Sequence, residues 1–202
     1  MQLSHQLNRL RVLALAWLAL NAVEFQAKAA DVPKAAAVCN ACHGEEGSSV
    51  LPLTPHLAAQ PNPYIQWQLV FFRSHNRKHE VMEPMAAGLS DPDIRALGAY
   101  FAAKPAAKPP TEPDDQVELT QHGEKIAQTH HCESCHGAGF VGNQAAARLA
   151  NQREDYLFKA LTDYKEGRRT GGGVAAMPDA VYPLQAEDLR ALAHYLSRLG
   201  SK

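Results

Sequence analysis

The spacing of apolar residues predicts helices along the whole chain. Such residues recur three and four positions apart near the end of each half: Ile94, Leu97, Gly98 and Phe101 in the first, and Leu189, Leu192, Ala193 and Leu196 in the second. This spacing places them on one face of a helix. Asp91 is the expected N-cap of the first of these helices, with Pro92 at its first helical position, and the helix should end before Pro105.

Further helices are expected over residues 32–39, 63–73, 117–132 and 154–166. No segment alternates apolar and polar residues as a half-buried strand does. We therefore predict an all-α protein.

The chain contains two copies of one unit. Leu57-Ala58-Ala59-Gln60-x-x-x-Tyr64 in the first copy matches Leu149-Ala150-Asn151-Gln152-x-x-x-Tyr156 in the second. The proline-rich stretch over residues 104–116 separates them, and it favours an extended connector over a continued helix. We predict an N-terminal domain over 30–103, a linker over 104–116 and a C-terminal domain over 117–202.

The first 29 residues predict a secretory signal peptide. Arg9 and Arg11 precede an apolar run over residues 12–20 that is short for a membrane span, and Ala27-Lys28-Ala29 offers a small-x-small cleavage site. We expect export to a bacterial periplasm and cleavage near Ala30. The alternative is an uncleaved anchor. No later apolar run approaches spanning length, so the mature protein should be soluble, with peripheral membrane association left open.

Every cysteine of the chain belongs to one of two C-x-x-C-H pentapeptides. This is the attachment signature of c-type haem, in which two thiols form thioethers and the histidine binds the iron. The predicted attachment residues are Cys39, Cys42, Cys132 and Cys135, and the predicted proximal ligands are His43 and His136. We therefore expect two covalently bound haems c and no disulfide. The alternatives are a redox dithiol, which would need a βαβ setting, and a four-cysteine zinc site, which would leave both histidines without a role.

Methionine is the expected ligand on the opposite side of each iron. Met177 lies seven residues before Leu184 and Met82 lies seven before Leu89, so the register of the repeat selects Met82 over Met85. A thioether ligand raises the potential of a haem. Histidine is the rival ligand type, and the candidates are His56, His75, His79 and His194. His79 is the strongest of these, because it lies three residues from Met82.

The charge balance argues against a nucleic-acid partner, since the formal net charge of the chain is −1. Basic residues nevertheless cluster in both copies, at Arg73, Arg77 and Lys78 and at Lys165, Arg168 and Arg169. We expect these clusters to lie in solvent at helix ends, where cations suit the helix dipole. The alternative is contact with haem propionates or with a redox partner.

Together these motifs resemble cytochrome c4, a family of periplasmic dihaem electron carriers. Each copy reads C-x-x-C-H-G, L-A-x-Q-x-x-x-Y, a methionine, and L-x-x-x-D-[IL]-x-x-L-x-x-Y, over about residues 38–199. The resemblance implies two tandem class I cytochrome c domains related by approximate two-fold symmetry, with axial pairs His43/Met82 and His136/Met177.

The resemblance also implies a proline carbonyl beside each proximal histidine. Pro52 or Pro55 could supply it in the first copy. The second copy has no proline over residues 144–147, which leaves the partner of His136 open and favours unequal potentials.

The expected function is electron transfer rather than catalysis, because an iron closed by histidine and methionine offers no site to a substrate. The resemblance suggests a soluble carrier between a quinol-oxidising cytochrome complex and a terminal oxidase. The alternative is a haem subunit of a periplasmic dehydrogenase, such as a sulfide-oxidising flavocytochrome. A dihaem enzyme is a third class, and it would need an open iron or a cysteine ligand.

Overall fold

The regular structure of the described residues is helical, as the sequence predicts. The computed structural model describes residues 32–170 and 176–199, so the predicted signal peptide lies outside the described residues. Within them the only β-type pairing is an isolated bridge between Asn143 and Ala146. Residues Ala35–Lys202 form one compact unit.

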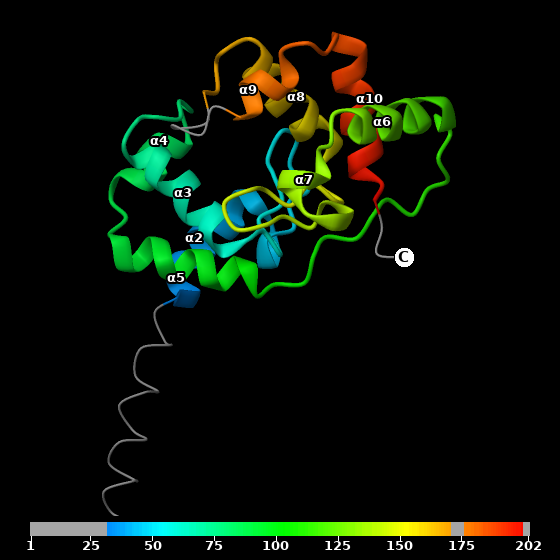
Figure 1. Ribbon diagram of the computed structural model, residues 1–202. Coiled ribbons are helices and arrows are strands. Elements are labelled where there is room, and N and C mark those ends of the chain that lie inside the picture. The colour runs from blue at the N-terminus through cyan, green and yellow to red at the C-terminus, as the bar shows by residue number, and fades with distance from the viewer. Residues whose placement is uncertain (1–31, 171–175, 200–202) are drawn as a thin grey trace, which may run out of the picture. The chain divides into compact units, whose positions relative to one another are not determined.

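Both halves of this unit repeat one order of helices (Figure 1). The first half contains α2 (Val32–His43), η1 (Glu45–Gly47), α3 (Asn62–Arg73), α4 (Met82–Ala87) and α5 (Asp91–Ala102). The second contains α6 (Val117–Thr129), α7 (Glu133–His136), η2 (Ala138–Phe140), α8 (Glu154–Lys165), α9 (Ala176–Val181) and α10 (Ala186–Ser197). The segment between α5 and α6 crosses from one half to the other, as the predicted linker should, although its exact bounds remain a prediction.

Three local predictions need correction. The first helix continues through the cysteine motif to His43, whereas the helix expected over 117–132 ends at Thr129 and a new helix starts at Glu133. His131 lies between them with a φ of 51°, a left-handed conformation that no α-helix can contain. The N-cap of α5 is Ser90 rather than Asp91, because its side chain accepts a hydrogen bond from the Asp93 amide in a capping box.

Each half has its own apolar core, supplied mainly by the face that the helical spacing predicts. The buried residues of the first core are Ala36, Ile65, Leu97 and Phe101. The buried residues of the larger second core include Ile126, Leu157, Leu161, Leu189, Leu192 and Leu196. The predicted face residue Ile94 is also buried, with 2% of its surface exposed. The periodic positions therefore face inward in both halves.

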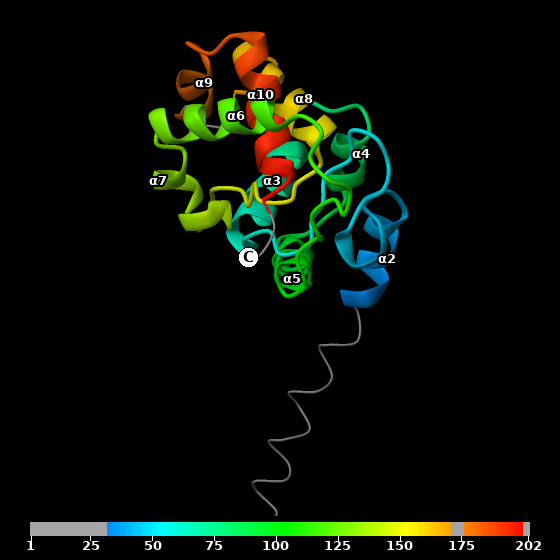
Figure 2. The same ribbon diagram turned by 90° about the vertical axis from the view of Figure 1, so that its right-hand side faces the viewer.

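Helices α6 and α10 pack against each other (Figure 2), and Gly123 lies where they approach closely. A Cβ atom added to Gly123 would lie 2.1 Å from the carbonyl oxygen of Ala191, so the two backbones are as close as a glycine allows. We expect Gly123→Ala to lower the free energy of unfolding by about 1–3 kcal/mol, because the two helices must move apart to make room for the added methyl group. Urea unfolding measures this loss. Gly88→Ala is the matched control, since no atom lies within 4 Å of its added Cβ, and equal losses in both variants would contradict the argument.

The linker is fastened to the second half by polar contacts. The side-chain amide of Asn151 donates to the Ala107 carbonyl at 3.2 Å, and the Arg198 guanidinium donates to the Glu112 carbonyl at 3.2 Å. Asp114 accepts from Thr120 Oγ1 at 2.6 Å and lies 3.1 Å from Nε2 of His194, a side chain that is only 1% exposed. These contacts anchor the linker beside α10.

Acid should loosen this anchor. The hydrogen bonds from Thr120, the Gln116 amide and His194 lower the pKa of Asp114 to about 2. A carboxyl whose pKa is depressed in the folded state stabilises the fold above its ordinary pKa, and this contribution is lost as the pH falls towards 2. We expect Asp114→Asn to weaken the pH dependence of unfolding in that range. Urea unfolding at a series of pH values tests this, with the exposed neighbour Asp115→Asn as control; a dependence unchanged from the parent protein would refute it.

No helix in the part of the chain that the structure describes is long and apolar enough to cross a membrane.

Candidate functional site

The two cysteine motifs place a histidine and two free thiols within, or directly before, one helix in each half. In the first half the whole motif lies at the C-terminal end of α2, so that Cys39 and Cys42 are separated by about one helical turn. In the second half Cys132 precedes α7 and Cys135 lies within it. All four thiols are free, with Cys42 and Cys135 exposed. Each motif can therefore form two thioethers.

Both histidines predicted as proximal ligands are buried and held by a backbone carbonyl. Nδ1 of His43 lies 2.9 Å from the Pro55 oxygen, and Nδ1 of His136 lies 2.8 Å from the Ala147 oxygen. Only 7% and 8% of these residues are exposed, and burial lowers the pKa of both imidazoles. The neutral ring is the form that ligates a metal, and with Nδ1 engaged by a carbonyl, Nε2 is the nitrogen left for iron.

Of the two prolines considered for His43, Pro55 supplies the carbonyl. The question left open for His136 is answered by Ala147, which shows that the role belongs to the backbone and needs no proline. Both carbonyls occupy the same place in the repeat. The donor set of each half therefore fits a covalently bound haem.

The methionines occupy matching places in the two halves. Met82 opens α4 and Met177 lies in the first turn of α9. Met177 packs against the second core, and Met82 is half-buried, whereas 43% of Met85 is exposed. The difference in exposure agrees with the choice of Met82 over Met85.

Two of the rival histidines are engaged elsewhere. His194 lies between Glu154 and Asp114, with each ring nitrogen 3.1 Å from a carboxylate oxygen. His75 contacts the carboxylate of Glu83. Within residues 32–170 and 176–199, no group of three or more His, Cys, Asp or Glu side chains has an arrangement that could hold a metal ion, as the zinc alternative requires.

The prediction that both basic clusters lie in solvent is wrong for two arginines. Arg169 is only 7% exposed; it donates to the Tyr64 hydroxyl at 3.3 Å and to Gln68 Oε1 at 3.0 Å. Arg77 also donates to Gln68 Oε1, at 2.6 Å, and to the Tyr156 hydroxyl at 3.1 Å. These five residues, which we call the arginine cluster, join the two halves.

The arginine cluster is strongly cationic. Burial raises the pKa of the Tyr156 phenol, but the guanidinium groups of Arg77 and Arg169 outweigh it and lower that pKa to about 7. No carboxylate contacts either guanidinium among the described residues, and Nε of Arg169 is buried without a hydrogen-bond partner. Buried charge of this kind calls for an anion. Haem propionates are carboxylates, so the cluster fits the predicted group.

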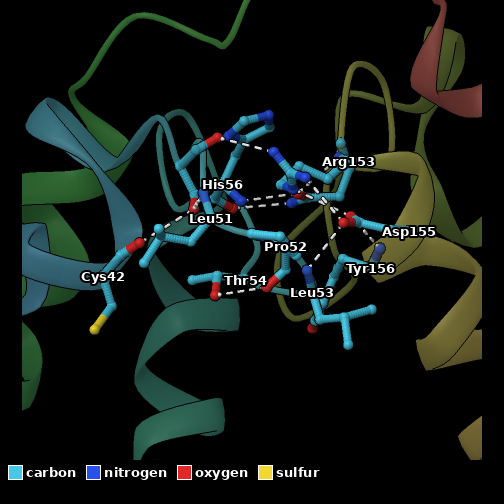
Figure 3. A network of polar contacts seen from close by, with 11 residues as sticks. Cys42, Leu51, Pro52, Leu53, Thr54, His56, Arg153, Asp155 and Tyr156 are labelled. Atoms are coloured by element: carbon cyan, nitrogen blue, oxygen red, sulfur yellow. Dashed lines mark hydrogen bonds and ion pairs between the residues drawn. The ribbon is translucent and has the colours of Figure 1, made fainter.

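A second network joins the loop after the first cysteine motif to the start of α8 (Figure 3). Asp155 accepts from the Leu53 amide at 2.9 Å and forms an ion pair with Arg153, which itself reaches the Ser49 carbonyl. Ser49 Oγ in turn donates to the Cys42 carbonyl at 3.1 Å. The backbone around the first motif is thus tied to the second half.

Sequence reasoning missed the residues that bridge the halves. Gln60 and Gln152 are buried at equivalent places and bond to the backbone of the opposite half, while Tyr64 and Tyr156 contact the opposite arginine. All four belong to the repeated L-A-x-Q-x-x-x-Y motif. Its recurrence with two polar residues at fixed places was the available signal.

Comparison with known proteins shows that this chain is similar to cytochromes c. The cytochrome c family model matches residues 120–200. Cytochrome c4 of Thiocapsa roseopersicina is 34% identical over 82% of this chain and 89% of its own length, and that of Pseudomonas aeruginosa is 34% identical over 96% and 100%. A thiosulfate dehydrogenase electron acceptor of Thiomonas intermedia is 31% identical over 93% of this chain and 90% of its own length.

Solved structures show the same likeness. The crystal structure of reduced recombinant cytochrome c4 from Pseudomonas stutzeri superposes with a TM-score of 0.76 at 31% identity, covering 84% of this chain and 96% of that one. A thiosulfate dehydrogenase from Marichromatium purpuratum matches with a TM-score of 0.67 at 32% identity over 79% of this chain and 36% of that chain. The fold is that of two tandem cytochrome c domains.

Proposed function

Since this chain belongs to the cytochrome c4 family, a family of dihaem electron-transfer proteins, we propose that it carries electrons between respiratory partners in the periplasm. It holds covalently bound haem c and is not an enzyme. The donor is a quinol-oxidising cytochrome complex and the acceptor is a terminal oxidase. Residues 1–29, which lie outside the described residues, act as the export signal.

In this proposal the chain holds each haem through one cysteine motif. The thioethers form at Cys39 and Cys42 in the first half and at Cys132 and Cys135 in the second. The axial pairs are His43 with Met82 and His136 with Met177. Arg77 and Arg169 hold propionates. When bound, haem supplies a reversible one-electron couple.

One observation carries the proposal most directly. Each half has a buried imidazole of lowered pKa, with Nδ1 held by a carbonyl, directly after a pair of free thiols. A redox dithiol would give these histidines no reason to be buried and oriented. In this proposal the protein orients two neutral histidine ligands, surrounds the cofactor with apolar side chains, and supplies positive charge that compensates the haem propionates.

A second candidate function is supported by the relatives. The thiosulfate dehydrogenase electron acceptor of Thiomonas intermedia aligns over 93% of this chain. The chain could by the same ligation serve as the electron-accepting subunit of a periplasmic dehydrogenase, the substrate being oxidised on another polypeptide. A sulfide-oxidising flavocytochrome is a further enzyme of that type.

Native fractionation of a periplasmic extract separates these roles. Covalent haem that elutes at the size of the free chain, at two haems per chain, supports the mobile carrier. Haem that elutes in a stoichiometric complex with a dehydrogenase supports the subunit. The matched control is the double variant Cys132→Ala, Cys135→Ala, which should retain one haem. An exported wild-type chain that carries no covalent haem would refute both roles.

A further inference from the structure

We propose that Gln60 and Gln152 are positioning residues that set the reduction potential of the haem in the opposite half. The inference rests on the proposed ligation of iron by His43 and His136. Gln152 would act on the haem of the first half, and Gln60 on the haem of the second.

Each glutamine forms a pair of hydrogen bonds with one backbone residue across the interface. Gln152 accepts from the His56 amide at 2.7 Å and donates to the His56 carbonyl at 2.9 Å. Gln60 accepts from the Arg148 amide at 3.0 Å and donates to the Arg148 carbonyl at 2.9 Å. Both glutamines are buried, with 3% of Gln60 and 5% of Gln152 exposed. Buried, two-point contacts of this kind fix a peptide with little freedom.

The bonded peptides are the ones that hold the proximal histidines. The His56 N–H and the Pro55 carbonyl belong to one planar peptide unit, and that carbonyl is the partner of His43 Nδ1. The Arg148 N–H and the Ala147 carbonyl likewise form one unit, whose oxygen is the partner of His136 Nδ1. In each half a continuous chain of hydrogen bonds runs from the imidazole, through one peptide, to a glutamine of the other half.

The direction of the effect follows from polarisation along this chain. A glutamine oxygen that accepts from the peptide N–H increases the negative charge on the peptide oxygen, since hydrogen bonds in series strengthen one another. A stronger acceptor makes the imidazole a more basic ligand. More basic ligation stabilises ferric iron, so each glutamine should lower the potential of the opposite haem and its removal should raise it.

Gln152→Leu and Gln60→Leu test the inference, because leucine is similar in size and makes no hydrogen bond. In Gln152→Leu the contacts of Asp155 and Arg153 with the same loop remain, so that loop stays attached. We expect the potential of the opposite haem to rise enough to change the equilibrium of electron exchange between the two haems about tenfold, or about 59 mV for a one-electron couple. The potential of the haem in the half that carries the substitution should shift much less.

Two readouts identify which haem has moved. Spectroelectrochemical titration gives both potentials, and NMR of the reduced, isotope-labelled protein gives the Nδ1–H resonance of each proximal histidine. Gln152→Leu should move the His43 resonance and Gln60→Leu that of His136. Gln→Glu at either position keeps an oxygen that accepts from the peptide N–H, so it should restore a low potential. The exposed Gln121→Leu is the control.

The outcomes are separable. A shift confined to the haem of the variant's own half, or no shift of either haem beyond that of Gln121→Leu, overturns the inference. Failure of the proposed ligation would already be visible in the wild-type protein. Its His43 and His136 ring N–H signals would not respond to haem reduction, or its haem content would fall below two per chain.

Discussion

Met177→Ala is expected to remove about half of the sulfur-to-iron charge-transfer absorption of the oxidised protein, because under the proposed ligation one of the two haems loses its thioether. Axial ligands move haem potentials across a range of roughly 0.8 V, so the potential of that haem should fall by roughly 100 mV or more. A thioether favours ferrous iron, and its loss favours the ferric state. Absorption spectroscopy and potentiometric titration measure the two effects.

The first half offers a sharper test of the same assignment, because it contains two methionines three residues apart. Met82→Ala should reproduce the effect of Met177→Ala on the other haem. Met85→Ala should leave both band and potential close to those of the parent protein, since 43% of Met85 is exposed. The opposite result, with the band lost in Met85→Ala and kept in Met82→Ala, would show that the repeat register selects the wrong residue.

The predictable parts of this protein are those whose chemistry depends on local spacing. The two C-x-x-C-H motifs and the helical faces around Leu97 and Leu192 are readable because their partners lie a few residues away. Helices α4 and α9 are too short for periodicity to indicate them, although they carry both of the methionines that we predict as ligands. The break of helix at His131 depends on one left-handed residue, for which the sequence around it carries no glycine signal.

What the sequence could not reveal is decided by packing between the halves. Arg169 and Arg168 are adjacent, and both were expected at a solvated helix end, yet one is 7% exposed and the other has 55% of its side chain exposed. Which arginine is buried depends on Tyr64 and Gln68, which are about a hundred positions away in the chain. Gln152 is part of the repeated motif, but its partner is the backbone amide of His56. Every residue except proline has such an amide, so the sequence does not indicate which one Gln152 binds.

The adjacent arginines provide a matched pair of variants for measuring what the interface contributes. Arg169→Met keeps most of the apolar volume but removes the hydrogen bonds that the guanidinium donates to Tyr64 and Gln68, and also the cation that lies over the Tyr164 ring at 4.6 Å. Hydrogen bonds from charged groups contribute roughly 1.5–3 kcal/mol each, so the loss of two should lower the free energy of unfolding by at least about 3 kcal/mol. Urea unfolding of the haem-loaded protein measures the loss.

Arg168→Met removes a guanidinium that pairs with Asp163 and Glu166 at the surface. Exposed ion pairs contribute between about 0 and 1 kcal/mol, so this control should unfold nearly as the parent does. The two substitutions delete the same charge at neighbouring positions, and only burial and the opposite half distinguish them. Equal losses would therefore mean that Arg169 acts through net charge alone. A loss confined to Arg169→Met would mean that the arginine cluster holds the two halves together, which the reciprocal control of the haem potentials requires.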